Sequence, residues 1–389
     1  MYKTEKMLER QIQFTLLETP SLLQQIIGFP YKLIAAYLDI SNWGFAGEID
    51  FVLQDESDDY IVVELEQKIN SNAKVEHVVE QVERYFSAAQ AIYGENVSCL
   101  IIAEESPSKF ISEVQNQLET KGIPTDIRLY QYADIECAYL KLQEMTENLF
   151  GIPSDTKFVK RSVASFGQLN EIFGKFKRDN LLELSLDRLK SIVCWKDPSA
   201  FSVRLRICKD LGLIDIETDK IMLTPSGQKF RDYTNFPYRI ESGRRFNSGA
   251  GDYLDLSEPQ KQILRSNILR AVRIGPTLNN TVLQIIAFLQ YVILFRGRYI
   301  VKNIAKQTVP SHVTAAFQEL IQRHHSLSEK AITDIISWSA RYCVNLGLVT
   351  LVDDGQYYRA VFTEEGSRFY RLISDQLNIL REERNLTLI

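Results

Sequence analysis

The sequence predicts an α/β domain with a mixed β-sheet, followed by two mostly helical modules. Short apolar segments of strand and helix type alternate in the first third of the chain, which is typical of an α/β layer structure. Further on, the segment that begins at Cys208 is repeated from Cys343, which indicates two copies of one small unit. We therefore expect domains at residues 1–148, 149–240 and 257–389, with a linker at 241–256.

The patterns of apolar residues predict the elements of the first domain in order. Two helical segments open the chain, with a break at Pro20. An amphipathic helix that ends at Gly94 and a shorter helix that ends before Gly122 follow further along. Strands are expected at 48–54, 60–68, 97–104 and 125–134.

Acidic side chains occur on two of these strands, where a buried charge is costly. Alternation places Asp50 on the polar face of the first strand. On the second strand it places Glu64, Glu66 and Lys68 on one face, and a hairpin between the strands would bring Asp50 near Glu64. A metal ion is a common strong partner for such carboxylates, although both could instead be exposed edge-strand residues paired with Arg or Lys.

Along the chain, an Asp is followed by a short gap and then by an apolar strand that ends in Glu64-x-Glu66. This pattern resembles the PD-(D/E)xK fold of restriction endonucleases and repair nucleases. The next helix contains Gln81-x-x-x-Tyr85, which resembles the QxxxY motif of the RecB/NucS-type branch. The opening helix is similar to the lead-in helix of that branch. The resemblance covers residues 1–145, and it implies a restriction-endonuclease-like mixed sheet and Mg²⁺-dependent hydrolysis of DNA phosphodiester bonds.

The resemblance also implies roles for single residues. Asp50 and Glu64 would hold the metal. Gln81 and Tyr85 would support the site or contact the phosphate backbone. Glu9, or Glu5 in its place, would be the first-helix acid that some members use. Gln81, Tyr85 and Glu9 could also be ordinary surface and packing residues.

Position 66 departs from the family pattern, because most members have Lys there and this chain has Glu66. Some restriction enzymes carry Glu-x-Glu at this place. Lys68 has the same strand phase and could take over the positioning of the attacking water, although it would lie about 6–7 Å further along the strand.

The repeat in the rest of the chain reads Cys-x-x-Leu-Gly-Leu, a hairpin, then Thr-x-x-Gly-x-x-Phe, with the two Leu-Gly-Leu copies 135 residues apart. A helix that ends in glycine, two strands and a further helix resemble the winged helix. In that family the helix before Leu-Gly-Leu enters the major groove, where Arg can read guanine. The expected DNA contacts are Ser202, Arg204 and Lys209 in the first copy, and Lys330, Ser337 and Arg341 in the second. Packing or protein contacts are the alternative use of these helices.

Four further arginines are candidate phosphate contacts. Arg244 and Arg245 lie in a segment rich in Gly and Ser that reads as a flexible linker. Arg296 and Arg298 flank Gly297 after an apolar helix. A solvated linker or an ordinary loop explains the same residues without DNA.

The bulk composition narrows the functional class. Residues 1–150 carry 11 Lys and Arg against 25 Asp and Glu, a net charge of −14, and the remainder carries 34 against 25, or +9. A basic region is compatible with nucleic acid, although an accidental charge split between two ordinary domains is possible. No apolar run is long enough for a membrane span, no signal peptide is visible, and the five scattered cysteines suggest a cytoplasmic protein. No zinc-ligand spacing and no glycine-rich phosphate loop occurs.

These observations favour a Mg²⁺-dependent, site-specific endonuclease for double-stranded DNA, similar to a type II restriction enzyme. Cleavage of both strands needs two active sites, so we expect a homodimer, a transient dimer on DNA, or a heteromer with a second nuclease chain. A defence or repair nuclease specific for DNA structure or modified bases is an alternative. A DNA-binding regulator with a decayed nuclease fold is another, and Glu66 in place of Lys is the feature that favours it.

Overall fold

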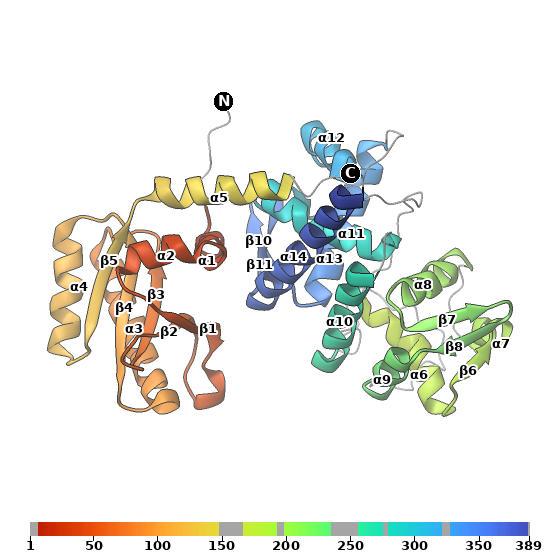
Figure 1. The fold of residues 1–389 in the computed structure, drawn as a ribbon, viewed down its shortest axis with the longest axis horizontal. Helices are drawn as coiled ribbons and strands as arrows, with labels where there is room; N and C mark the ends of the chain where they lie inside the picture. The colour runs from red at the N-terminus through yellow and green to blue at the C-terminus, as the bar shows by residue number, and fades with distance from the viewer. Residues whose placement is uncertain are drawn as a thin grey trace. The chain divides into compact units, whose positions relative to one another are not determined.

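A computed structural model describes residues 7–147, 166–192, 198–234, 256–274, 279–320 and 327–387. The chain divides into two compact units, residues 1–145 and 146–389 (Figure 1).

Unit 1 is a five-stranded mixed sheet covered by helices. The strands lie in the order β1-β2-β3-β4-β5; β1, β2 and β3 are antiparallel, and β3, β4 and β5 are parallel. Helices α3 and α4 pack beside each other and contact the parallel strands. The elements are α1 (Glu9–Glu18), α2 (Pro20–Ile27), β1 (Lys32–Asp39), β2 (Glu48–Gln54), β3 (Tyr60–Glu66), α3 (Asn72–Tyr93), β4 (Val97–Glu104), α4 (Ser108–Thr120), β5 (Thr125–Tyr130) and α5 (Tyr132–Glu147).

Apolar strands and an amphipathic helix build the core of this unit. Strands β3 and β4 are buried on both faces, as expected for the parallel part of a sheet. Helix α3 begins at Ser71, whose hydroxyl accepts a hydrogen bond from the Lys74 amide, and ends at Gly94. Its valines, from Val75 to Val82, pack into the core that the sequence pattern predicts.

The structure differs from the sequence prediction at three places in the sheet. Strand β5 ends at Tyr130 rather than at residue 134, because helix α5, which the sequence patterns did not predict, begins at Tyr132. Strand β1 was not predicted, because "KLIAAYLD" lacks strict alternation; it contains a bulge after Leu33 and a left-handed residue at Tyr37 (φ 52°). Strand β3 ends at Glu66 rather than at Lys68, so Lys68 lies beyond the strand and is exposed.

Unit 2 contains two modules with the same order of elements. The first comprises α6 (Asn170–Arg178), β6 (Glu183–Ser185), α7 (Leu186–Ile192), α8 (Pro198–Asp210), β7 (Ile214–Glu217), β8 (Lys220–Leu223) and α9 (Pro225–Asp232). The second comprises α11 (Asn280–Leu294), β9 (Ile300–Val301), α12 (Ser311–Leu320), α13 (Glu329–Asn345), β10 (Val349–Asp354), β11 (Tyr357–Phe362) and α14 (Glu364–Thr387). The sheets have matching orders, β6-β8-β7 and β9-β11-β10. The predicted repeat is therefore confirmed.

The repeated residues form the same turn in both modules. Gly212 and Gly347 are left-handed (φ 65° and 71°) directly after the helices α8 and α13. The Thr224 hydroxyl donates to the Gly212 carbonyl (2.7 Å), and its backbone amide donates to the Leu213 carbonyl (3.2 Å). Thr363 makes the corresponding bonds to Gly347 (2.6 Å) and Leu348 (3.1 Å). The motif is thus a closed turn between helix and hairpin.

Glycine is required at the end of the motif because two backbones meet there. A Cβ at Gly227 would lie 1.9 Å from the Leu213 carbonyl oxygen, and one at Gly366 would lie 1.7 Å from the Leu348 oxygen. Both distances are below any real carbon contact. The hairpin therefore approaches the following helix too closely for a side chain.

Helix α10 (Glu258–Ile274) contacts both modules at equivalent residues. The Asn267 amide donates to the Leu211 carbonyl (2.8 Å), and the Arg265 guanidinium donates to the Leu346 carbonyl (3.1 Å). Leu211 and Leu346 are the same position of the repeat. One helix therefore binds the carboxyl ends of α8 and α13.

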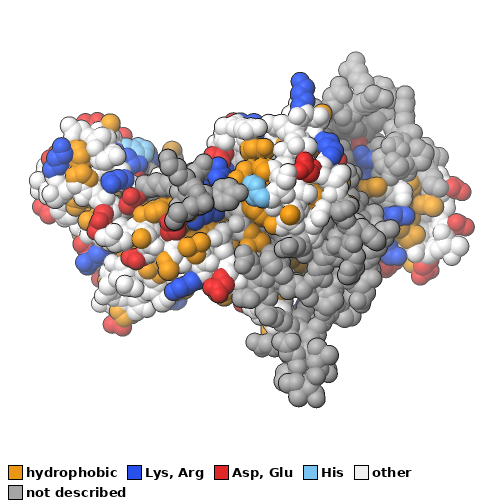
Figure 2. Space-filling view, turned by 90° about the horizontal axis from the view of Figure 1, so that it is seen from above, with side chains coloured by type: hydrophobic (Ala, Val, Ile, Leu, Met, Phe, Trp, Pro, Cys, Tyr) orange, Lys and Arg blue, Asp and Glu red, His pale blue; other side chains and the backbone are white. Residues whose placement is uncertain are grey.

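The apolar segment at 282–295 is the core helix α11, as predicted, and it is buried along most of its length. No helix in the described ranges has the length and apolar character to cross a membrane. On the face drawn in Figure 2, basic side chains form small groups among acidic ones, and no single basic surface is visible between the grey atoms.

Candidate active site

Three carboxylates of unit 1 lie on one face of the two strands β2 and β3. The register pairs Val52 with Val62, and by continuation it brings Asp50 opposite Glu64, with Glu66 two residues further on. All three are buried, with exposed fractions of 6%, 5% and 2%. The predicted proximity of Asp50 and Glu64 is confirmed, and the alternative of exposed edge-strand residues is wrong.

Protein donors occupy both oxygens of Asp50. The Gln13 side chain of α1 donates from Nε2 to Oδ1 (2.5 Å), and the Leu65 amide of β3 donates to Oδ2 (2.7 Å). Gln13 is itself buried. Helix α1 and strand β3 therefore hold the carboxylate in a fixed orientation, as hydrogen bonds to both oxygens require.

Glu66 pairs with a lysine that sequence reasoning missed. Lys74, in the first turn of α3, places Nζ 2.6 Å from Glu66 Oε2. Lys68, the predicted lysine, lies past the end of β3 and is exposed. The positive charge next to the carboxylates thus comes from the following helix, because the chain turns back over the sheet after β3.

Burial and mutual repulsion raise the pKa values of the cluster. Loss of hydration, more than any neighbouring charge, raises the pKa of Asp50 well above its usual value, and the Leu65 amide opposes this in part. Burial and then the charge of Asp50 raise the pKa of Glu64 in the same way. Burial also raises the pKa of Glu66, and Lys74 lowers it. A compensating cation would therefore favour ionised carboxylates here.

Helix α1 supplies the rim of the cluster. Crowding by protein atoms, followed by the charge of Glu66, raises the pKa of Glu9, although solvent still reaches this side chain. The neighbouring Arg10 forms an ion pair with Glu48 at the start of β2, and its guanidinium lies 4.6 Å from the Tyr37 ring centre. Glu9 thus lies beside the cluster, and the alternative residue Glu5 lies outside the described residues.

Gln81 and Tyr85 lie on the side of α3 that faces the start of β2. Tyr85 is buried, and its ring packs so closely on Gly47 that a Cβ there would lie 3.1 Å from the ring. The Gln81 amide donates to the Tyr85 hydroxyl (3.5 Å), while its buried Oε1 has no hydrogen-bond donor among the described residues. Tyr85 therefore positions the strand that carries Asp50.

The donor set suits a hard divalent cation. No three His, Cys, Asp or Glu side chains of the described ranges are grouped so that they could hold a metal ion. Mg²⁺ commonly uses only one or two protein carboxylates and takes its other ligands from water and substrate phosphate. Asp50 and Glu64 provide two such carboxylates, with pKa values that a cation would lower.

Three of the solved structures to which this chain is similar are nuclease structures. The crystal structure of a repair endonuclease from Pyrococcus abyssi matches with 22% identity and a TM-score of 0.25, over 33% of this chain and 49% of that chain. An EndoMS–dsDNA2 complex matches with 18% identity and a TM-score of 0.25, over 34% and 48%. EndoMS in apo form matches with 19% identity and a TM-score of 0.23, over 33% and 48%. The matches span about half of those chains. No protein-family model and no curated protein matches this sequence.

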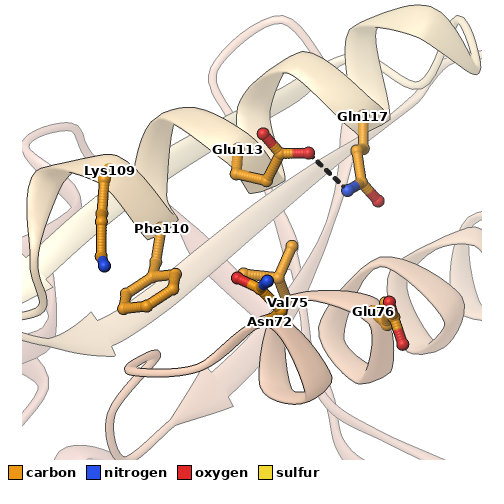
Figure 3. Close-up of a pocket in the computed structure, with 7 residues that line it drawn as sticks. All are labelled: Asn72, Val75, Glu76, Lys109, Phe110, Glu113 and Gln117. Carbon is orange, nitrogen blue, oxygen red and sulfur yellow. Dashed lines mark hydrogen bonds between the residues drawn. The ribbon is translucent and has the colours of Figure 1, made fainter.

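A hollow of about 460 Å³ lies between the first turns of α3 and the helix α4. Figure 3 shows Lys109 and Phe110 of α4 on one side and Asn72, Val75 and Glu76 of α3 on the other. Glu113 accepts a hydrogen bond from Gln117 at its far end (2.7 Å). No carboxylate of the cluster lines this hollow, so it is separate from the candidate site.

The candidate DNA contacts of the first module have different surroundings. Ser202 and Lys209 are exposed on α8. Arg204 is only partly exposed, and its guanidinium donates to the Gln168 side chain (3.0 Å). Ser202 and Lys209 are therefore placed to meet a ligand, whereas Arg204 also has a structural contact.

In the second module, the structure contradicts the predicted DNA contact of one candidate residue. Ser337 is buried, and its hydroxyl donates to the Thr333 carbonyl of its own helix (2.7 Å), so it cannot contact a base. Lys330 pairs with Asp334 (3.3 Å) and also donates to the Ile304 carbonyl. Arg341 is exposed, with its guanidinium 4.9 Å from the Trp338 ring centre.

The four candidate phosphate contacts divide into two pairs. Arg244 and Arg245 lie outside the described residues. Arg296 and Arg298 are partly exposed in the turn after α11, where Arg298 also approaches Asp354 (3.7 Å).

Sequence reasoning missed Arg270 and Arg273, which are exposed one turn apart on α10 beside a hollow of about 580 Å³. Their i, i+3 spacing on a helix is the signal that could have indicated them.

Proposed function

We propose that this protein is a Mg²⁺-dependent endonuclease that cleaves double-stranded DNA at specific sites, similar to a type II restriction enzyme. One observation carries the proposal. Asp50 and Glu64 are buried opposite each other on neighbouring strands, with raised pKa values and a lysine beside them. Three buried acids with one lysine carry an excess of negative charge, which a bound cation would balance.

In this proposal Asp50 and Glu64 hold Mg²⁺, and the bound cation supplies charge relief at the scissile phosphate and a more acidic water. Gln13 and the Leu65 amide orient Asp50. Lys74, held by Glu66, points its ammonium toward the same face and positions the attacking water, the task expected of Lys68 from sequence. Glu9 adds negative charge at the rim, which strengthens cation binding.

The two modules of unit 2 are proposed as winged-helix readers of DNA sequence, with Ser202, Lys209 and Arg341 on their exposed helix faces. Residues 151–389 carry the excess of positive charge that a polyanion partner needs. Cleavage of both strands then requires two copies of the chain or a second subunit, so a dimer on DNA belongs to the proposal.

A DNA-binding regulator without catalysis is the second candidate. The hydrogen bonds to both oxygens of Asp50 favour it, because they already satisfy the carboxylate without a cation. A nuclease for modified or irregular DNA shares the chemistry of the first candidate and differs only in its substrate.

Digestion of long, unmodified double-stranded DNA tests the proposal. Wild type with Mg²⁺ should give discrete fragments, and EDTA, Asp50→Asn or Glu64→Gln should reduce cleavage at least about 1000-fold, because each removes the cation or its ligand. Lys68→Met is the matched control and should cleave like wild type. Intact DNA with tight binding under all conditions would contradict catalysis on ordinary DNA and favour the regulator.

A further inference from the structure

Three aromatic side chains gather at the surface of the second module. Tyr299 lies between the other two, with ring centres 5.6 Å from His312 and 5.5 Å from Tyr357, and it meets both edge-on. His312 is exposed, and both tyrosines are partly exposed. We call these three residues the aromatic platform. Aromatic rings usually gather in cores, so such a group at the surface needs an explanation.

The backbone under the platform is strained and firmly held. Arg296 and Tyr299 are left-handed (φ 51° and 67°), a conformation that is costly for residues with side chains. Between them, a Cβ at Gly297 would lie 1.8 Å from the Ala360 carbonyl oxygen. The Ala360 amide donates to the Gly297 carbonyl (2.8 Å), and the buried Tyr291 hydroxyl donates to the Arg298 carbonyl (2.5 Å). These contacts thus hold Tyr299 in a fixed position despite its costly backbone conformation.

The first module provides an internal comparison. Its corresponding strands β6 and β8 read "ELS" and "KIML" and contain no aromatic residue. In the second module, Tyr299 directly precedes strand β9, and strand β11 begins with Tyr357 and Tyr358. The Tyr357 hydroxyl donates to the Thr308 carbonyl (3.2 Å), but the fold that the two modules share forms without a platform, so the repeated architecture does not require the three rings together.

One cation, Arg298, lies next to the platform. Its guanidinium lies 5.3 Å from the Tyr299 ring centre, and Asp354 partly balances its charge at 3.7 Å. Aromatic faces combined with a cation suit a flat ring joined to a phosphate, which is an unpaired nucleotide.

We propose that Tyr299, His312 and Tyr357 form a stacking site for an unpaired nucleobase of DNA. This rests on the proposed DNA-directed function and adds a substrate feature to it. A base within an intact duplex exposes no face, so the occupant is a base in a bulge, a gap or a single strand, or one turned out of the helix. The phosphate next to that base would lie near Arg298.

Fluorescence anisotropy tests this proposal with the full-length protein and without added metal, so that no cleavage occurs. The probes are a labelled DNA duplex with a central bulge of unpaired thymines and the same duplex fully paired. Tyr299→Gly should weaken binding of the bulged probe at least about fivefold and change the paired probe less than about twofold. Glycine suits the left-handed backbone, so this variant removes the ring without unfolding the turn.

Two further variants separate the ring from other effects. Tyr299→Phe keeps the face and should bind the bulged probe within about twofold of wild type. Tyr233→Ala removes an exposed tyrosine of the first module and should change neither probe. Equal affinity of wild type and Tyr299→Gly for the bulged probe would overturn the proposal, as would binding of a proline-rich peptide in place of both DNA probes. Because no cleavage is measured, failure of the nuclease proposal would leave this result unaffected.

Discussion

At the scale of residues, period-two alternation was sufficient to predict the carboxylate cluster. It placed Asp50, Glu64 and Glu66 on one face, and the antiparallel register brought the first two opposite each other. It could not predict Lys74, because the distance between a helix and a strand depends on packing across the core and not on spacing along the chain. For the same reason Ser337 looked available on its helix, although the fold buries it.

Removal of Lys74 tests its role beside the carboxylates. Lys74→Met should lower the cleavage rate about 100-fold. It should also lower the free energy of unfolding by about 2 kcal/mol at neutral pH, because Glu66 then stays buried without its partner. Steady-state kinetics and urea denaturation measure the two effects. Lys74→Arg should retain most of the stability, and equal activity of Lys74→Met and wild type would refute the assignment.

The raised pKa values of Asp50 and Glu64 predict how stability depends on pH. In the folded protein these groups keep their protons to a higher pH than in the unfolded chain, so the unfolded state releases protons first. Their contribution is fully present below the usual carboxyl pKa and is lost as pH rises through the folded values. Glu64→Gln should therefore gain stability relative to wild type as the pH rises from about 4 to above neutrality. Thermal denaturation without divalent cations measures this difference, and a constant difference across that range would contradict it.

At the scale of elements, the sequence predicted the repeat and its turn. Glycine and threonine that recur at a fixed spacing indicate a particular turn, because few other local structures require them. Most helices and strands of the first domain also followed from their patterns, but helix α5 did not, and its first residues were predicted as part of a strand at 125–134. Strand β1 did not follow either, since its bulge interrupts the alternation on which the prediction depended. Helix α10 showed an apolar pattern but no sign that it contacts both modules, because its Arg265 and Asn267 bind distant backbone carbonyls.

Alanine at the close-packed glycines tests the turn. Gly227→Ala and Gly366→Ala should each cost about 3 kcal/mol of unfolding free energy, because the added carbon collides with a carbonyl oxygen. Gly355→Ala is the matched comparison, since that left-handed glycine has open space and should cost only about 1 kcal/mol. Chemical denaturation gives the three values, and a similar cost at all three positions would show that the collision is relieved.

At the scale of the whole molecule, the sequence predicted three domains, and the structure divides into two compact units. The predicted front boundary at 148 lies close to the division at residue 145. The two modules belong to one unit, because α10 packs on α9 of the first and on α14 of the second. Contacts of this kind join residues far apart in sequence, so composition does not reveal them. The linker predicted at 241–256 lies outside the described residues, apart from Leu256.

Calorimetry should therefore resolve two unfolding transitions. Mg²⁺ should raise the melting temperature of one of them by a few degrees, because it binds the folded unit 1 only. Asp50→Asn should abolish this shift and leave the other transition unchanged. Three separate transitions would contradict the union of the two modules, and a shift of both would place the cation elsewhere.

The contacts of α10 have a consequence for the spacing of bases in a DNA target. Because Arg265 and Asn267 attach one helix to the same position of both repeats, these contacts oppose a change in the distance between α8 and α13. If both modules read bases as proposed, the two halves of a recognition sequence must be separated by a fixed number of base pairs. One inserted base pair would rotate a half-site by about a tenth of a helical turn, and binding would fall sharply rather than gradually.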